Sequence, residues 1–190
     1  KNPIHEQAVR AAIEEIAPEI PVSLSSEVLP EINEYERVST TAVNAYTKPT
    51  AARYLARLEE RMAGLGAGGE LLLMQSSGGI NSVDTARDFP VRVIESGPAA
   101  GALGAAHYAR LAGLDHVLSF DMGGTTAKMC LVQEGRVSRT TEFEVAHVHR
   151  FKRGSGIPVR VPVLDLMEIG AGGGSVAHIS EVGTLQVGPE

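Results

Sequence analysis

The first third of the chain carries apolar residues at helical spacing. Within residues 6–17 they fall on one face, at Val9, Ala12, Ile13 and Ile16, and Pro18 ends the pattern. A longer helical pattern runs over residues 38–64, where Pro49 predicts a kink or a break. Its apolar stripe consists of Val43, Tyr46, Tyr54, Leu55, Leu58 and Met62. Between the two helices, the alternation over residues 22–25 predicts a strand.

From Leu71 onward the pattern changes to short apolar runs separated by glycine. Such runs are too short for helices and predict strands at residues 71–74, 91–94, 116–122, 127–133, 137–145, 159–163, 166–169 and 175–179. The strands at 71–74, 116–122 and 127–133 are apolar enough to predict burial in a sheet. A helix rich in Ala and Gly is expected over residues 97–112. The predicted fold class is therefore α/β, with antiparallel strands in the second half.

Composition narrows the functional classes. The chain has 190 residues, of which 43% are hydrophobic, so it suits one globular domain or two parts of a larger one. A net charge of −6 argues against a nucleic-acid partner, and the short basic cluster at 149–153 is typical of a solvated loop. No apolar stretch is long enough to cross a bilayer, and the N-terminus lacks a secretory pattern. We therefore expect a cytoplasmic protein with no membrane partner.

Cys130 is the only cysteine, which excludes an intrachain disulfide and an all-cysteine metal site. It lies in the apolar run 129–132, where a buried, inert thiol is expected. The chain begins at Lys1 rather than Met and ends at Glu190 without a closing element. We therefore expect it to be a central fragment of a longer protein.

The most informative motif is Asp121-Met122-Gly123-Gly124-Thr125-Thr126, which joins two predicted strands. Glycines at a turn let backbone N–H groups face an anion without obstruction by a Cβ atom. Threonine hydroxyls add donors for phosphate oxygens, and a carboxylate at a strand end can hold Mg²⁺ through water. Because only residues 123–126 separate the strands, we expect an antiparallel hairpin whose tip presents open N–H groups. In the alternative interpretation, Asp-x-Gly-Gly only satisfies turn geometry.

A second glycine-rich segment is Gly170-Ala171-Gly172-Gly173-Gly174-Ser175. Ordering four glycines costs much conformational entropy, so an ordered segment of this kind indicates a function. It is a candidate substrate or phosphate loop formed by Gly172, Gly173, Gly174 and Ser175, or else a mobile connector. His147, His149 and His178 are candidate metal ligands, although solvated histidines are commoner. Asp165 and Glu168 are expected at the surface or anchoring a loop.

The segment from Glu95 to Ala106, a run of small residues that starts a helix, precedes the aspartate motif. This pair resembles the connecting helix and second phosphate hairpin of the actin-like ATPase superfamily. Three further stretches narrow the resemblance to the hydantoinase A/5-oxoprolinase family: residues 24–31 with 35–37, residues 74–79, and residues 169–175. The resemblance covers essentially the whole chain.

The resemblance implies an actin-like, ribonuclease H-like fold and an enzyme that uses ATP and Mg²⁺ to hydrolyse a cyclic amide, such as N-methylhydantoin or 5-oxoproline, by phosphorylating the amide oxygen. Residues 1–112, with a connecting helix at 97–112, would end the first lobe. Residues 113–190 would start the second lobe, with the phosphate hairpin at 119–133. Gly123, Gly124, Thr125 and Thr126 would hold the phosphates, and Asp121 would lie near Mg²⁺. A hydantoinase B-type subunit or domain is the implied partner.

The chain departs from the family pattern at Lys128, where many relatives carry aspartate. Lysine cannot coordinate Mg²⁺, but it can pair with a phosphate or with Asp121, so we keep both as candidate catalytic residues. The family's first phosphate loop and its adenine-side glycine motif do not occur in these 190 residues, so we expect this chain alone to be inactive. Two alternatives stay open. One is a subunit of an ATP-dependent acetone- or acetophenone-type carboxylase, and the other is a nucleotide-regulated binding module of the chaperone kind.

Overall fold

The computed structural model describes residues 2–148 and 154–188, and the chain divides into two compact units. Unit 1 contains Lys1–Ser96 and Thr140–Val163, whereas unit 2 contains Gly97–Arg139 and Leu164–Glu190. This division differs from the expected boundary after residue 112, because residues 140–163 pack with the first part of the chain. The assignment of residues 1–112 and 113–190 to two lobes stays a prediction.

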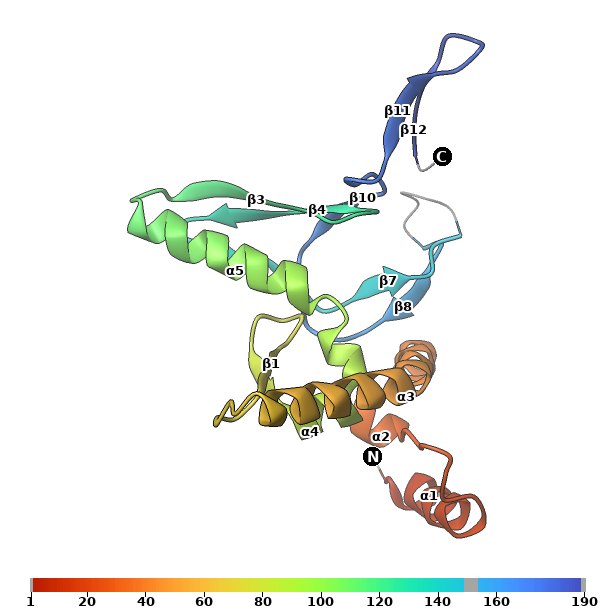
Figure 1. Cartoon of the computed structure of the whole chain (residues 1–190). Helices are drawn as coiled ribbons and strands as arrows, with labels where there is room; N and C mark the ends of the chain where they lie inside the picture. Colours follow the sequence, from red (N-terminus) through yellow and green to blue (C-terminus); the bar gives the residue numbers. More distant parts are fainter. Residues whose placement is uncertain (1, 149–153, 189–190) are drawn as a thin grey trace. The chain divides into compact units, whose positions relative to one another are not determined.

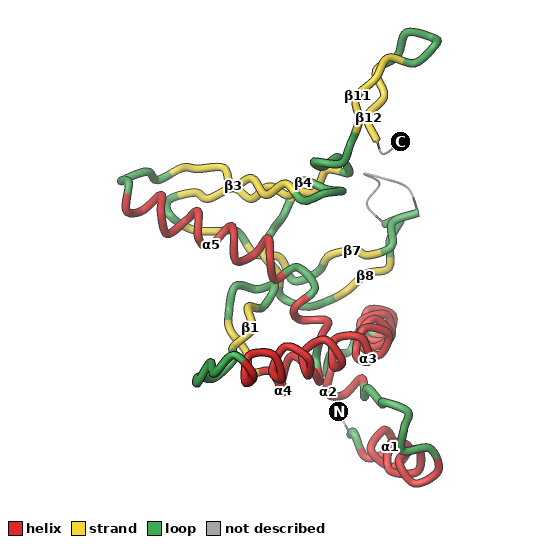
Figure 2. The backbone as a smooth tube through the Cα atoms, viewed as in Figure 1, coloured by secondary structure: helices red, strands yellow, loops and turns green. Residues whose placement is uncertain are grey.

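Unit 1 is mainly helical and carries two small antiparallel hairpins (Figure 2). Its elements in chain order are α1 (Ile4–Ile16), α2 (Ser25–Val28), α3 (Glu34–Gly64), β1 (Leu72–Met74), β2 (Ile80–Ser82), α4 (Val83–Asp88), the 3-10 helix η1 (Pro90–Val93), β7 (Phe143–Val145) and β8 (Ile157–Val159). β1 pairs with β2, and β7 pairs with β8. One cluster of buried side chains joins α2, η1 and the segment around β8: Val28, Val91, Val159, Val161 and Val163.

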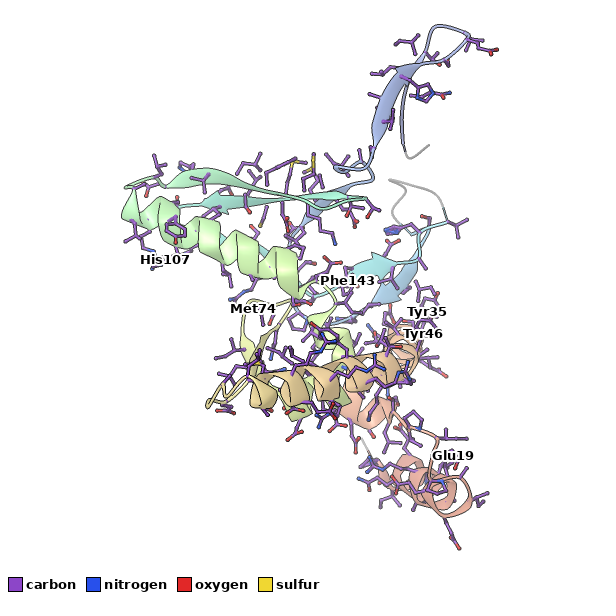
Figure 3. All side chains as sticks on the ribbon, in the orientation of Figure 1. Glu19, Tyr35, Tyr46, Met74, His107 and Phe143 are labelled. Atoms are coloured by element: carbon purple, nitrogen blue, oxygen red, sulfur yellow. The ribbon has the colours of Figure 1, made fainter. Side chains whose placement is uncertain are left out.

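The apolar stripe expected on the long helix α3 is buried in part: Val43, Leu58 and Met62 are half-buried, whereas Tyr54 is exposed. Leu55 is buried, but Tyr46 is 86% exposed, and Figure 3 shows it with Tyr35 on the helix surface. The other buried positions are polar, namely Ser39, Thr40 and Asn44. These side chains are buried because they bind backbone groups of other segments of unit 1, which satisfies their polar atoms. Pro49 lies inside the helix without splitting it, although the helix axis changes direction along its length (Figure 1).

Two strands expected in unit 1 are absent. Residues 22–24 are irregular and lead into α2, where Ser25 and Ser26 bind the carboxylate of Glu6. Residues 90–93 form η1 because Pro90 supplies no N–H for a strand ladder and Arg92 N–H bonds back to the carbonyl of Phe89. β1 forms as expected, within a two-stranded sheet with β2, but it is not buried on both faces.

Unit 2 is built on the hairpin of β3 (His116–Met122) and β4 (Ala127–Gln133), whose bounds match the expected strands. β10 (Met167–Ile169) and the short β5 (Arg136–Val137) also pair antiparallel with β4. The helix α5 (Ser96–Leu111) lies along this sheet in Figure 1, and Ala99 and Ala102 pack against Cys130 and Leu164. Small residues on α5 allow this close approach. A separate hairpin is formed by β11 (Val176–Ile179) and β12 (Leu185–Gly188).

The expectation that both hairpin strands are buried was wrong for one face of the hairpin, where Leu131 of β4 is 54% exposed beside three residues of β3. Leu118, Phe120 and Met122 are 57%, 55% and 53% exposed, respectively. The reason is the period of two along a strand, which places these residues on the sheet face opposite to the one facing α5. Cys130, on the covered face, is buried as predicted, and burial raises the pKa of its thiol, with the Asp165 carboxylate as a second cause.

The expected strand at 137–145 is broken into β5, β6 (Arg139–Thr140) and β7, because the chain passes from unit 2 to unit 1 there. Similarly, the expected strand at 159–163 is divided between β8 and β9 (Val163–Leu164), and β9 pairs with β6. Of the expected loop at 149–158, residues 149–153 lie outside the described residues and residues 154–156 form a turn, but residues 157 and 158 belong to β8, so the loop ends earlier than expected. No helix in the described part of the chain is long and apolar enough to cross a membrane.

Candidate functional site

The tip of the β3–β4 hairpin has the geometry expected from its sequence. Met122 pairs with Ala127, so the connection consists of residues 123–126, and no helix begins at Gly124. The N–H group of Gly123 donates to the carbonyl of Thr126 at 2.9 Å and closes the turn. Asp121, Gly123, Gly124 and Thr125 are all exposed. The predicted antiparallel hairpin is therefore confirmed, and its tip is accessible within unit 2.

The backbone groups of the tip fall into two sets. The carbonyls of Gly123 and Gly124 accept hydrogen bonds from the N–H groups of Gly173 and Gly174, at 2.9 and 2.8 Å. The N–H groups of Gly124 and Thr125 have no hydrogen-bond partner within the described residues. Both residues are exposed, so these two donors are suited to binding an anion such as a phosphate oxygen. The N–H of Gly123, in contrast, is used within the turn.

A row of three charged residues crosses the sheet beside the tip. The strand register pairs Asp121 of β3 with Lys128 of β4, and Lys128 with Glu168 of β10. Lys128 Nζ lies 4.0 Å from Glu168 Oε1, and the Lys128 side chain is only 16% exposed. Its charge is therefore held next to β3, at the position of Asp121 in the register. Sequence reasoning placed Glu168 at the surface and missed this row, because the pairing of β10 with β4 joins residues forty positions apart.

The glycine loop that follows β10 lies directly against the hairpin tip. A Cβ atom on Gly172 would lie 2.6 Å from the carbonyl oxygen of Gly123 and 2.7 Å from the nitrogen of Thr125. On Gly173, a Cβ atom would meet its nearest neighbour at 3.7 Å, which is an ordinary contact. Only glycine therefore fits at position 172 without displacing backbone. The structure brings together the two glycine-rich motifs that the sequence analysis treated separately.

The N–H groups of this loop are already engaged. Those of Gly173 and Gly174 bind the tip, that of Gly172 donates to the hydroxyl oxygen of Ser175 at 3.0 Å, and that of Ser175 donates to the carbonyl of Gly172 at 2.9 Å. From Gly172 to Ser175, the backbone donors are therefore not available to a phosphate in this arrangement. A substrate or phosphate contact of the loop itself stays a prediction, and its remaining donor is the Ser175 hydroxyl.

The candidate metal ligands do not form a cluster. Within residues 2–148 and 154–188, no three His, Cys, Asp or Glu side chains gather as they would around a metal ion. His147 Nδ1 lies 3.9 Å from Glu144, His178 is exposed on β11, and His149 lies outside the described residues. The Glu144 carboxylate instead accepts hydrogen bonds from the N–H groups of Gly154 and Gly156, which lower its pKa. A position of Asp121 near a Mg²⁺ ion stays a prediction.

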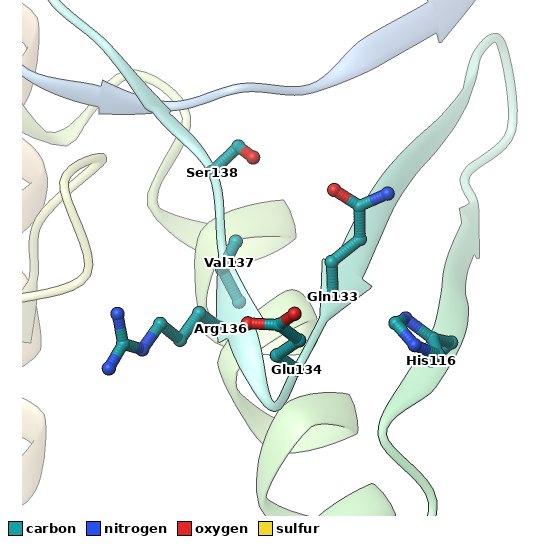
Figure 4. Close-up of a pocket in the computed structure, with 6 residues that line it drawn as sticks. All are labelled: His116, Gln133, Glu134, Arg136, Val137 and Ser138. Carbon is teal, nitrogen blue, oxygen red and sulfur yellow. The ribbon is translucent and has the colours of Figure 1, made fainter.

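An open pocket of unit 2 lies at the other end of the hairpin (Figure 4). It measures about 390 Å³ and is lined by His116, Gln133, Glu134, Arg136, Val137 and Ser138. Arg136 and His116 point in different directions in Figure 4, so the charged groups do not converge on one position. His116 and Gln133 form the pair farthest from the tip in the β3–β4 register. The pocket is thus separate from the motif residues, and the tip remains the candidate site.

Comparison with known proteins finds relatives along the whole chain. The chain is 44% identical to an uncharacterised protein of Methanocaldococcus jannaschii, 37% to the caprolactamase alpha subunit of Pseudomonas jessenii, and 32% to the acetophenone carboxylase gamma subunit of Aromatoleum aromaticum. These matches cover 100%, 100% and 99% of this chain, but only 28%, 26% and 25% of the relatives. The chain therefore spans about a quarter of the length of these relatives.

Solved structures agree with the expected fold. The crystal structure of the ATP-dependent caprolactamase from Pseudomonas jessenii matches with a TM-score of 0.74 at 36% identity. A nucleotide-free acetone carboxylase matches with a TM-score of 0.81 at 24% identity, which supports the fold alone. Each match covers all of this chain and 26% of the other. The expected α/β fold of the actin-like ATPase type is therefore confirmed. The sequence model of the hydantoinase/oxoprolinase family matches residues 37–190, and the chain belongs to this family.

Proposed function

We propose that this chain is part of an enzyme that uses ATP to open a cyclic amide, and that the β3–β4 tip binds phosphates of the nucleotide. The observation that carries the proposal is the pair of unpartnered N–H groups at Gly124 and Thr125, two exposed residues of the turn that follows Asp121 and Met122 of β3. The similarity to an ATP-dependent caprolactamase supports the reaction class, because caprolactam is a cyclic amide.

The residues present suit a nucleotide and its metal ion. Two N–H groups and the hydroxyls of Thr125 and Thr126 can donate to phosphate oxygens, and donors at an exposed hairpin tip lose only water when they bind. One carboxylate is enough for Mg²⁺, which retains several waters and takes other ligands from the phosphates. Asp121 would therefore hold the ion through water. Lys128, kept beside β3 by the register, would offset negative charge next to the tip.

Amide hydrolysis needs help because resonance stabilises the C–N bond. When bound, ATP would supply a phosphoryl group to the amide oxygen, which removes the amide resonance and opens the carbon to attack by water. The C–N bond would then break with the nitrogen taking a proton, and a second water would release the phosphate from the acyl phosphate that is left. The task of this chain's residues is then to position the phosphates and to neutralise their charge. Lys128 cannot act as the base that takes a proton from water while it is charged, so we assign it charge neutralisation only. We further propose a partner subunit or domain, since the relatives at 37% and 32% identity are named as subunits.

A carboxylase subunit is the second candidate, because the acetophenone carboxylase gamma subunit is 32% identical over 99% of this chain. One assay on the full-length protein separates the candidates. Phosphate release from ATP is measured with N-methylhydantoin, 5-oxoproline or caprolactam, and separately with acetone or acetophenone plus bicarbonate. Stimulation by a cyclic amide, with formation of the ring-opened acid, is the expected result. Stimulation only by a ketone with bicarbonate would favour the carboxylase, and release that no substrate changes would favour a binding module.

A further inference from the structure

We infer that the loop Gly172–Ser175 positions the hairpin tip, and that its two bonds to the tip set the direction of the phosphate-binding N–H groups. This inference rests on the proposed function, since it concerns how the same site is held. It gives the glycine loop a positioning role in place of direct contact with phosphate through its backbone. The residues that carry it are Gly172, Gly173 and Gly174.

The argument follows from the planarity of the peptide group. In a trans peptide, the carbonyl of one residue and the N–H of the next point in opposite directions. The carbonyl of Gly123 is held by the N–H of Gly173, so the N–H of Gly124 must point away from the loop. Likewise, the bond from Gly174 to the carbonyl of Gly124 turns the N–H of Thr125 away. Two bonds on one side of the tip therefore orient two donors on the other.

This device needs a glycine at position 172. A Cβ atom there would lie within 2.8 Å of three backbone atoms of residues 123–125, and backbone cannot yield as a flexible side chain can. An added methyl group would push the loop away from the tip and lengthen both hydrogen bonds. Each tip peptide would then be free to rotate, and the two donors would no longer be fixed before a phosphate binds. Preorganised donors bind charge more strongly than donors that must reorient.

Alanine substitutions in the loop give a graded test with an internal control. The distance from the added Cβ to its nearest neighbour is 2.6 Å at position 172, 3.0 Å at 174 and 3.7 Å at 173. In the full-length protein, we expect Gly172→Ala to raise the dissociation constant of ATP with Mg²⁺ by about tenfold or more. Gly174→Ala should have an intermediate effect, and Gly173→Ala, which keeps its N–H group and adds a Cβ atom at an ordinary contact distance, should have the smallest effect of the three. The melting temperature should not follow this order, because the tip and residues 173 and 174 are exposed.

Hydrogen–deuterium exchange without nucleotide separates this inference from the proposed function. We expect faster exchange in segment 169–176 for Gly172→Ala than for Gly173→Ala, because the amides of Gly173 and Gly174 lose their acceptors. If wild-type protein binds no ATP, the proposed function fails, whereas the exchange result still decides whether the loop holds the tip. Equal effects of the two variants on exchange would overturn the inference. If wild-type protein binds ATP and Gly172→Ala binds it equally well, the inference is also overturned. The same holds if the three variants lose ATP affinity in proportion to their loss of melting temperature.

Discussion

The two units use opposite means to join segments that are distant in sequence. In unit 1, polar side chains reach from a helix to the backbone of other segments, and Asn44 is the fullest example. Its amide nitrogen donates to the Ser23 hydroxyl and the Asp88 carbonyl, and its oxygen accepts from the N–H of Val91. In unit 2, the tip and the glycine loop are joined by backbone atoms alone. Unit 1 is thus sensitive to the loss of a side chain, and the site in unit 2 is sensitive to the gain of one.

The largest effect is expected from Asn44→Ala, since Asn44 is fully buried and makes three hydrogen bonds. The substitution leaves the N–H of Val91 without its acceptor and should lower the free energy of unfolding by about 3 kcal/mol. Urea unfolding measures the change. Asn33→Ala is the matched control, because Asn33 precedes the same helix but makes no side-chain capping bond. Similar losses of unfolding free energy in both variants would show that the hydrogen bonds of Asn44 do not stabilise unit 1.

Asp121→Asn should affect turnover and spare stability. Asp121 is exposed at the end of β3, so its carboxylate contributes little to packing. We expect phosphate release by the full-length enzyme to fall by about 100-fold or more, as when a group that stabilises developing charge is removed. The free energy of unfolding should change by less than about 0.5 kcal/mol. If phosphate release and the free energy of unfolding fall together, Asp121 serves the turn structure. Its role would then be structural, like that of the buried polar side chains of unit 1.

The hairpin could be predicted from the sequence because its determinants are local. Two apolar runs and four intervening residues fix both the pairing and the turn, so strands 116–122 and 127–133 were found with their observed bounds. The contact between the tip and Gly172 could not be predicted, because it depends on the register of β10 against β4. A run of glycines in a sequence indicates that another backbone segment packs close to it, but it does not identify that segment. Here the segment is the glycine motif at the hairpin tip.

The polar face of α3 was missed for a related reason. Hydrophobic periodicity identifies the buried face of a helix only when burial is apolar, and α3 instead buries Ser39, Thr40 and Asn44. Each is satisfied by a group far along the chain. The Ser39 hydroxyl donates to the carbonyl of Pro158, and that of Thr40 accepts from the N–H of Arg160. Only the folded arrangement of unit 1 reveals these partners.

A smaller effect is expected from Glu6→Gln, which tests a charged tether of unit 1. Burial tends to raise the pKa of Glu6, but hydrogen bonds from Ser26 N–H and from the Ser25 and Ser26 hydroxyls, together with Arg37, outweigh it and lower the pKa overall. Removing the charge should cost about 1–2 kcal/mol of unfolding free energy at pH 7. Glu14→Gln, on an exposed position of the same helix, should change it by less than about 0.5 kcal/mol.

The pH dependence of this effect has a defined sign. Because the folded pKa of Glu6 is lowered, its stabilisation is complete above the unfolded value of about 4.3 and is lost as pH falls through the folded value. The stability difference between wild type and Glu6→Gln should therefore shrink below about pH 4. Urea unfolding between pH 3 and pH 7 measures it. A difference that is constant over this range would show that the charge of Glu6 is not what stabilises the contact.

The smallest change in stability is expected at the tip itself, from Thr125→Ala. The Thr125 side chain is exposed and makes no hydrogen bond within the described residues, so the free energy of unfolding should change by less than about 0.5 kcal/mol. The substitution removes a hydroxyl donor but keeps the backbone N–H, so the dissociation constant of ATP should rise only about fivefold. Thr125→Ser keeps the hydroxyl and should restore wild-type affinity. If both variants bind ATP like the wild type, the tip acts through its backbone alone, and a large loss of stability in either would remove the contrast between the two units.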